Sequence, residues 1–113
     1  MKYSVHLKKL SEREKRVWQI ISWRYGNENA ITSTEIQNQT GIDRFQLAAI
    51  IQSLRLVHNV PVASKKHGKN KGYFLPAKST EIDLTVADLE SQASKLLDVA
   101  TVLWKARKEL PEA

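Results

Sequence analysis

Four lysines lie within seven residues, between positions 65 and 71, and form the densest group of lysines in the chain. Gly68 and Gly72 bound a short loop between two apolar segments, so the lysines fall at a hairpin tip rather than in a core. Ammonium groups at such a tip can neutralise the phosphates of a nucleic acid. A solvated tip that only keeps the protein soluble is the alternative. The candidate residues of this loop are Lys65, Lys66, His67, Lys69, Asn70 and Lys71.

A second group of hydrogen-bonding side chains lies on one face of a predicted helix over residues 44–58. Arginine suits guanine and glutamine suits adenine, because each can make two hydrogen bonds to a base edge in the major groove. Ordinary helix surface is the alternative for each residue. The candidates on this face are Arg44, Gln46, Gln52 and Arg55, together with the apolar ring of Phe45.

Three hydroxyl residues, Thr32, Ser33 and Thr34, stand where another helix is predicted to begin. The first N–H groups of a helix are free and can bind a phosphate. Capping of the helix by one of these side chains accounts for at least one of them.

Catalysis and metal binding find no support in the residue pattern. The three histidines, His6, His58 and His67, are far apart in sequence, and the chain has no cysteine. No serine, histidine and acid are grouped at a recognisable spacing, and no glycine-rich phosphate loop occurs. We therefore expect neither an enzyme nor a bound cofactor or metal.

The charge is unevenly distributed along the 113 residues, which carry a net charge of +6. Residues 1–83 hold 14 Lys and Arg against 7 Asp and Glu, whereas residues 84–113 hold 4 against 5. The basic excess therefore lies before residue 84, which favours a nucleic-acid partner for that part of the chain. No strongly basic amphipathic helix, apolar leader or membrane span is predicted, so we expect a cytoplasmic protein without a membrane partner.

The elements that position these groups can be read from capping patterns. Ser11 with Glu14 predicts a helix that runs to about Tyr25, and the stop signal Gly26-Asn27 follows. A helix from about Ser33 is predicted to end at Gly41, which provides a left-handed C-cap. Asp43 with Gln46 caps the helix over 44–58, whose apolar residues Leu47, Ile50, Ile51 and Leu54 share the buried face.

The rest of the chain predicts a hairpin and a long helix. Residues 30–31 could form a very short strand, and 60–65 and 71–76 the two strands of the hairpin. Residues 79–84 are predicted to be a linker, and Thr85 with Asp88 to cap a last helix over 85–110. The domain prediction is thus 1–78 for the compact part, 79–84 for the linker and 85–110 for a helix that oligomerises or forms a lid.

The last helix has a seven-residue repeat, with leucines at d and mainly alanines at a. A self-association seam is one interpretation, a lid packed on Trp18 and Trp23 is another, and the helix could serve as both. Arg107 at an a position disfavours a parallel dimer, in which two arginines would meet. The predicted dimer interface consists of Leu89, Ala93, Leu96, Ala100, Leu103 and Trp104.

Three segments together carry a family resemblance: TSTEIQNQTGIDRFQLAAIIQSLR, VPVASK and KGYFLP. Over residues 10–77 the chain resembles the winged helix–turn–helix superfamily, and specifically small bacterial and phage proteins with a long C-terminal helix. The resemblance implies a mainly α fold with a small β-hairpin wing, an α+β class. It also implies a second helix that enters the major groove of double-stranded DNA and a wing that contacts the backbone.

The expected function is sequence-selective binding of double-stranded DNA, which the resemblance implies, by a homodimer, which the seven-residue repeat predicts. The role would be transcription regulation, or assistance in the replication or excision of a mobile element. One departure favours an alternative, because Phe45, Ala48 and Ala49 lie on the exposed face of the predicted DNA-reading helix. Small apolar residues can contact thymine methyls. They would equally suit an adaptor that binds another protein and not DNA.

Overall fold

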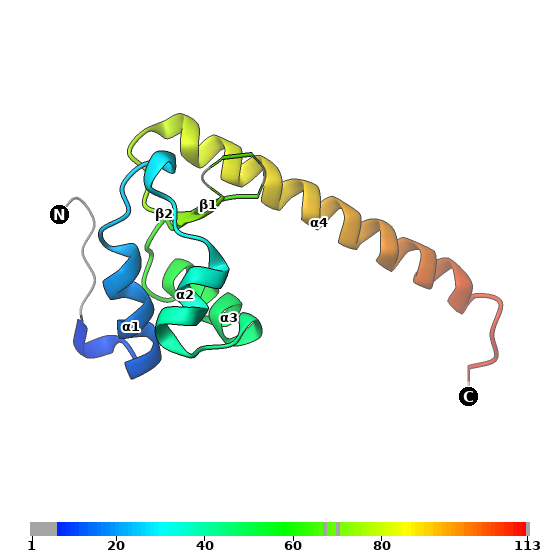
Figure 1. Cartoon of the computed structure of the whole chain (residues 1–113). Coiled ribbons are helices and arrows are strands. Elements are labelled where there is room, and N and C mark those ends of the chain that lie inside the picture. The colour runs from blue at the N-terminus through cyan, green and yellow to red at the C-terminus, as the bar shows by residue number, and fades with distance from the viewer. Residues whose placement is uncertain (1–6, 67, 70, 113) are drawn as a thin grey trace.

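A small body of helices and a hairpin, with one long helix projecting from it, makes up the computed structural model (Figure 1). The structure describes residues 7–66, 68–69 and 71–112. It is mainly helical with one two-stranded antiparallel sheet, which confirms the α+β class. The elements in chain order are η1 (Leu7–Lys9), α1 (Glu12–Ile21), η2 (Asn27–Asn29), α2 (Ser33–Thr40), α3 (Arg44–Leu56), β1 (Ala63–Lys65), β2 (Gly72–Phe74) and α4 (Ser79–Arg107).

Helices α1, α2 and α3 enclose one apolar core. The predicted inner face of α3 is confirmed, because its four apolar residues are all buried. The predicted caps are confirmed as well: Thr32 accepts a hydrogen bond from the backbone of Glu35, and Gly41 ends α2 in the left-handed conformation with φ of 72°. The core consists of Leu10, Val17, Trp18, Ile21, Ile31, Ile36, Ile42, Leu47, Ile50, Ile51, Leu54, Val60, Val62 and Leu75.

Helix α1 ends at Ile21, four residues before the predicted end at Tyr25. The backbone beyond it is used by another partner: Leu75 donates to the carbonyl of Arg24, and Gly26 donates to the carbonyl of Leu75. Pairing with the segment after β2 therefore replaces the last predicted helical turn.

The hairpin pairs Ala63 with Phe74 and Lys65 with Gly72. Ile31 adds an isolated bridge beside the hairpin, because it exchanges two backbone hydrogen bonds with Tyr73, at 2.9 and 2.8 Å. The predicted short strand at 30–31 is thus a single bridge. This bridge fixes the hairpin over the start of α2. The layout of three helices and a hairpin is compatible with a winged helix.

The last helix begins at Ser79, so the predicted linker over residues 79–84 is wrong. Glu81 is the reason, because its carboxylate accepts hydrogen bonds from the backbone of Ala77 at 2.7 Å and of Lys78 at 3.1 Å, at the helix start. Thr85, which was predicted to cap the helix, is buried inside it. Its hydroxyl is 3.2 Å from both the N–H and the carbonyl of Ser64, which joins α4 to β1.

Beyond its first turns, α4 leaves the body and projects into solvent (Figure 1). Every described residue from Glu90 onward is exposed. The lid interpretation of this helix is therefore wrong for the single chain. Trp18 is 4% exposed and belongs to the core, whereas Trp23 is 84% exposed and is not covered by α4.

Candidate nucleic-acid interface

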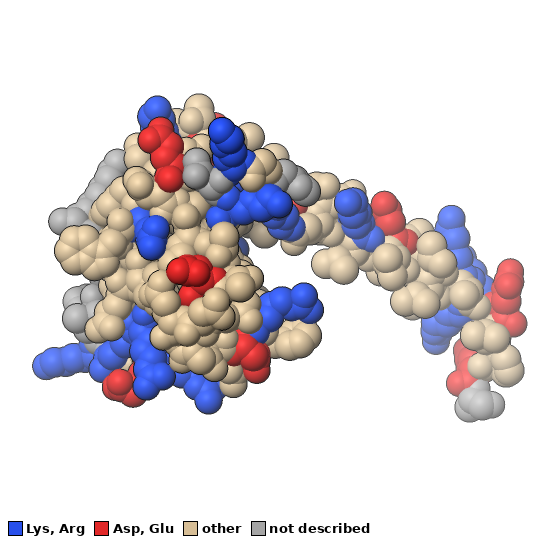
Figure 2. Space-filling model, in the orientation of Figure 1, with Lys and Arg blue, Asp and Glu red and all other residues tan. Residues whose placement is uncertain are grey.

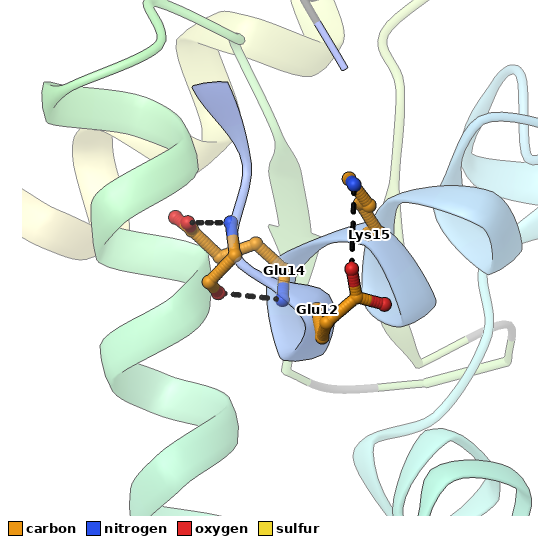
Figure 3. Close-up of polar contacts among 4 residues, drawn as sticks. Glu12, Glu14 and Lys15 are labelled. Carbon is orange, nitrogen blue, oxygen red and sulfur yellow. Dashed lines mark hydrogen bonds and ion pairs between the residues drawn. The ribbon is translucent and has the colours of Figure 1, made fainter. Parts of the chain in front are cut away.

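Helix α3 is held against α1 by a nearly buried polar cluster centred on Glu14. One carboxylate oxygen of Glu14 accepts from the backbone of Ser11 at 2.9 Å, and the Ser11 hydroxyl accepts from Glu14 in return at 3.1 Å (Figure 3). The other oxygen accepts from the Ser53 hydroxyl of α3 at 2.6 Å and lies 3.4 Å from His58 Nε2. The N-cap of α1 therefore also sets the position of α3.

Burial alone would raise the pKa of Glu14. The hydrogen bonds from the backbone and hydroxyl of Ser11 and from the Ser53 hydroxyl outweigh burial, and the nearby His58 adds to them, so the pKa lies below its ordinary value. The cluster is thus formed around the carboxylate at neutral pH.

The outer face of α3 is open to solvent along its length. Phe45 is 75% exposed, and the guanidinium carbon of Arg44 lies 5.1 Å from the centre of its ring. Ala48, Ala49 and Gln52 are also exposed. This face combines two long hydrogen-bonding side chains with a small apolar centre. It is the face on which the sequence predicted base contacts.

Two predicted members of that face have other partners. Gln46 is half-buried, and its amide oxygen accepts from the backbone of Asp43 at 3.2 Å in the helix cap. Arg55 is half-buried at the far end of α3, where its Nε donates to the carbonyl of Val62 at 2.9 Å. Burial lowers the pKa of Arg55, although Tyr73 acts in the opposite sense. Arg55 therefore supports the start of the hairpin.

At the start of α2, some of the hydroxyls that were predicted to bind a phosphate make local hydrogen bonds instead. Thr32 caps the helix, and the Ser33 hydroxyl accepts from the side-chain amide of Gln37 at 2.9 Å. Thr34 is exposed. Two of the three hydroxyls therefore make local hydrogen bonds, as capping predicts.

The four lysines of the hairpin lie in β1 or in the loop between β1 and β2. Lys66, Lys69 and Lys71 are exposed, and Lys65 is half-buried. His67 and Asn70 lie outside the described residues. Gly72, at φ of 127°, lies so close to the Ile31 carbonyl that a Cβ would overlap it. This close approach sets the base of the lysine-bearing loop against the start of α2.

Arg13 is a basic residue near α3 that the sequence reasoning missed. It lines a shallow pocket of about 290 Å³ between α1 and α3, together with Gln46 and Ala49. Arg13 is exposed and so brings a cation to the border of the α3 face. The sequence signal for Arg13 was the charge balance, because the four hairpin lysines account for only part of the excess of Lys and Arg over Asp and Glu before residue 84.

The two parts of the molecule differ in their surface charge. Figure 2 shows Lys and Arg side chains along the lower edge of the body and beside the hairpin. Along the projecting part of α4, basic and acidic side chains alternate. A basic body and a balanced helix are consistent with the counts for residues 1–83 and 84–113.

The predicted dimer residues are exposed on the projecting helix. Leu89 is 43%, Leu96 71%, Leu103 67% and Trp104 63% exposed, and Ala93 and Ala100 are exposed beside them. Arg107 lies over the ring of Trp104, with 5.3 Å between its guanidinium carbon and the ring centre.

Comparison with known proteins gives no assignment: no family model matches the sequence, and neither a curated protein nor a solved structure does. Within the described residues, no group of three or more His, Cys, Asp or Glu side chains is placed to hold a metal ion. No described helix is long and apolar enough to cross a membrane.

Proposed function

We propose that this chain is a winged helix–turn–helix protein that binds double-stranded DNA sequence-selectively and carries out no chemistry. Helix α3 would enter the major groove, and the hairpin would contact the flanking backbone as the wing. The observation that carries the proposal is the outer face of α3, open along its length and flanked by cations. Its Arg44 and Gln52 suit base edges, and the alanines between them let the helix approach thymine methyls.

The backbone contacts would come from three places around α3. Lys66, Lys69 and Lys71 project from the wing, Arg13 borders α3 on the α1 side, and the α2 start offers Thr34. Contacts of this kind position a protein on the duplex without reading its sequence.

We further propose that the protein acts as a homodimer through α4, in the cytoplasm. The exposed leucines of the projecting helix support a partner, because a monomer rarely leaves so long an apolar stripe in water. Transcription regulation, or assistance in the replication or excision of a mobile element, is the role that the family resemblance implies.

A protein-binding adaptor is the second candidate, and the exposed ring of Phe45 favours it. Phe45, Ala48 and Ala49 would then contact another protein, and the wing lysines would serve solubility. Large exposed aromatic side chains are common contacts at protein interfaces.

Fluorescence anisotropy with a labelled random duplex, at low and moderate salt, separates the two candidates. If each protomer neutralises about four phosphates, log K should fall with log[salt] at a slope of about −3.6. Phe45→Ala is the companion variant: loss of partner-protein binding with retained DNA affinity favours the adaptor. A slope near zero in the parent protein rules out the DNA-binding proposal.

A further inference from the structure

The apolar stripe of α4 starts inside a pocket of the body. This pocket, of about 320 Å³, lies between the end of α3, the segment before β1 and the first turns of α4. From α4 it is lined by Ile82, Val86 and Leu89, which are 39%, 43% and 43% exposed. Val86 and Leu89 are also the first a and d residues of the heptad repeat. The stripe that lines the pocket therefore continues outward along the projecting helix.

The projecting half of α4 is apolar beyond its a and d positions. Leu97 and Trp104 occupy e positions and are 68% and 63% exposed. Val99, at a g position, is 57% exposed. An apolar face of this width needs a cover. The nearly balanced charge of residues 84–113 argues against an anionic membrane as that cover, because helices that lie on such membranes carry an excess of Lys and Arg.

We propose that a second copy of the chain covers this face, with its α4 antiparallel to the first and its tip in the pocket. Heptad positions a and d face each other in such a pair when the two residue numbers add up to 189, 196 or 203. The sum of 196 is the register that brings Arg107, the last residue of α4, to the level of Leu89 at the pocket. Ala93 then meets Leu103 of the partner subunit, and Leu110 of the partner subunit, which follows the end of α4 at Arg107 by three residues, comes to the level of Val86. Leu96 likewise meets Ala100 of the partner subunit.

Antiparallel pairing of a with d matches the alanines of the seam with leucines. Each alanine of the seam faces a leucine, so the layers fill evenly and the helices can approach to about 8 Å. A parallel pair would instead stack alanine on alanine and leucine on leucine, and would bring two Arg107 side chains together. In the antiparallel pair, Arg107 lies at the level of Leu89 and Glu90 of the other chain, where a carboxylate is available.

The same register also accounts for the apolar residues at the e and g positions. The two-fold axis passes at the level of residue 98, so Leu97 and Val99 each lie next to their own copies. These are positions that usually carry charge in a simple two-stranded coil. Their apolar character widens the interface at its centre.

The geometry also sets the distance between the two bodies. With a rise of 1.5 Å per residue, the two Val86 residues lie about 36 Å apart along the pair. That distance is close to one turn of B-DNA, the separation of half-sites read by many dimeric proteins. Only this use of the spacing rests on the proposed DNA-binding function; the pairing itself does not.

Cysteine crosslinking without DNA tests the pairing, because the chain has no cysteine of its own. Ala93→Cys and Leu103→Cys change exposed residues, so neither should unfold the body. The variants are oxidised separately and as a mixture, and separated on a non-reducing gel. We expect a shift to dimer in the mixture and no shift for either variant alone, because identical positions lie about 15 Å apart along the axis. Ser94→Cys mixed with Leu103→Cys is the control and should stay monomeric.

Two results would overturn the pairing. Crosslinking of Ala93→Cys with itself indicates parallel helices, and sedimentation of the parent as a monomer at tens of micromolar indicates no self-pairing. The second result would also overturn the homodimer on which the pairing rests, but neither result bears on DNA affinity, so failure of the pairing and failure of DNA binding remain distinguishable.

Discussion

Arg44 and Arg55 carry the same guanidinium group at the two ends of α3, but their surroundings give them different roles. Arg44 is exposed and stacks on Phe45, so it is available to a partner. Arg55 is half-buried, donates to Val62 and has a buried Nη2 atom without a hydrogen-bond partner among the described residues. The side-chain type alone would assign both to DNA.

Arg44→Ala and Gln52→Ala should each reduce the discrimination between a preferred site and random DNA. A good bidentate base contact is worth about 1–3 kcal/mol, whereas non-specific affinity depends on phosphate contacts that these variants keep. Anisotropy competition with the preferred and the random duplex measures the ratio of the two affinities. If each change weakens both duplexes equally, the two residues contact the backbone instead. Arg55→Ala is the contrast, since it should lower stability and leave the ratio unchanged.

Gly72→Ala should destabilise the protein by at least about 2 kcal/mol, because an added Cβ meets the Ile31 carbonyl and the backbone is strained at positive φ. Gly41→Ala is the matched control: it also has positive φ, but a Cβ there meets no atom within 4 Å. That control should lose about 1–2 kcal/mol from strain alone. Urea unfolding compares the two, and equal losses would show that the contact with Ile31 is unimportant.

At the scale of elements, the sequence predicted the starts of α1, α2 and α3 well because their signals are local. The caps Ser11, Thr32 and Asp43 and the left-handed Gly41 act within four residues of the helix ends that they define. The buried face of α3 follows from apolar spacing alone. The α4 start was misplaced because Thr85 resembles an N-cap, while its hydroxyl in fact serves Ser64, 21 residues away. No local pattern encodes that contact.

Glu81→Gln should destabilise the protein at neutral pH by roughly 1–3 kcal/mol, because an amide would turn its N–H₂ toward backbone donors. Burial would raise the pKa of Glu81, but donors from Asn27, Ala77 and Lys78 outweigh it and lower the pKa. A lowered pKa means that the carboxylate stabilises the fold above its ordinary pKa, and that this contribution is lost as pH falls through the folded value.

The stability difference between parent and Glu81→Gln should therefore shrink below about pH 4.5. Urea unfolding at a series of pH values measures it. Glu28→Gln, an exposed carboxylate on the neighbouring η2, is the control and should show little effect. A difference that is constant with pH would mean that the charge of Glu81 is unimportant.

The wing should contribute phosphate contacts rather than base recognition. Replacing its four lysines, at positions 65, 66, 69 and 71, with alanine should flatten the salt dependence and weaken binding to all duplexes alike. Some slope should remain, because Arg13 and the α3 cations are kept. Each lost phosphate contact changes the slope by about 0.9. An unchanged slope in anisotropy titrations would show that these lysines only solvate the tip.

At the scale of the whole molecule, the seam on α4 should hold two copies together. Leu96→Glu places a charge in that seam and forgoes about 2 kcal/mol of apolar burial in each copy. Sedimentation should show a monomer, and circular dichroism an unchanged helix content. Lys95→Glu, on the polar side of the helix, is the control and should remain a dimer. A dimeric Leu96→Glu protein would place the contact elsewhere.

The direction of α4 was beyond sequence reasoning. The heptad pattern predicted an apolar stripe and left open whether the stripe folds back on Trp18 or faces outward. The outcome depends on two side chains, Glu81 and Thr85, which fix the first turns to η2 and β1. Such contacts form between residues 21 and 54 positions apart, so no short window contains them.

The continuity of α4 gives it the properties of a lever. Its 29 residues form a rod of about 43 Å, clamped at one end near Glu81 and Thr85 and free at the other. A tilt of about 5° at the clamp moves the far end by about 3 Å, roughly the rise of two residues. Small changes where the hairpin meets the helix are thus magnified at the tip. Weaker contacts near Glu81 and Thr85 would make the position of a partner bound at the tip less well defined, even if every residue of the tip were unchanged.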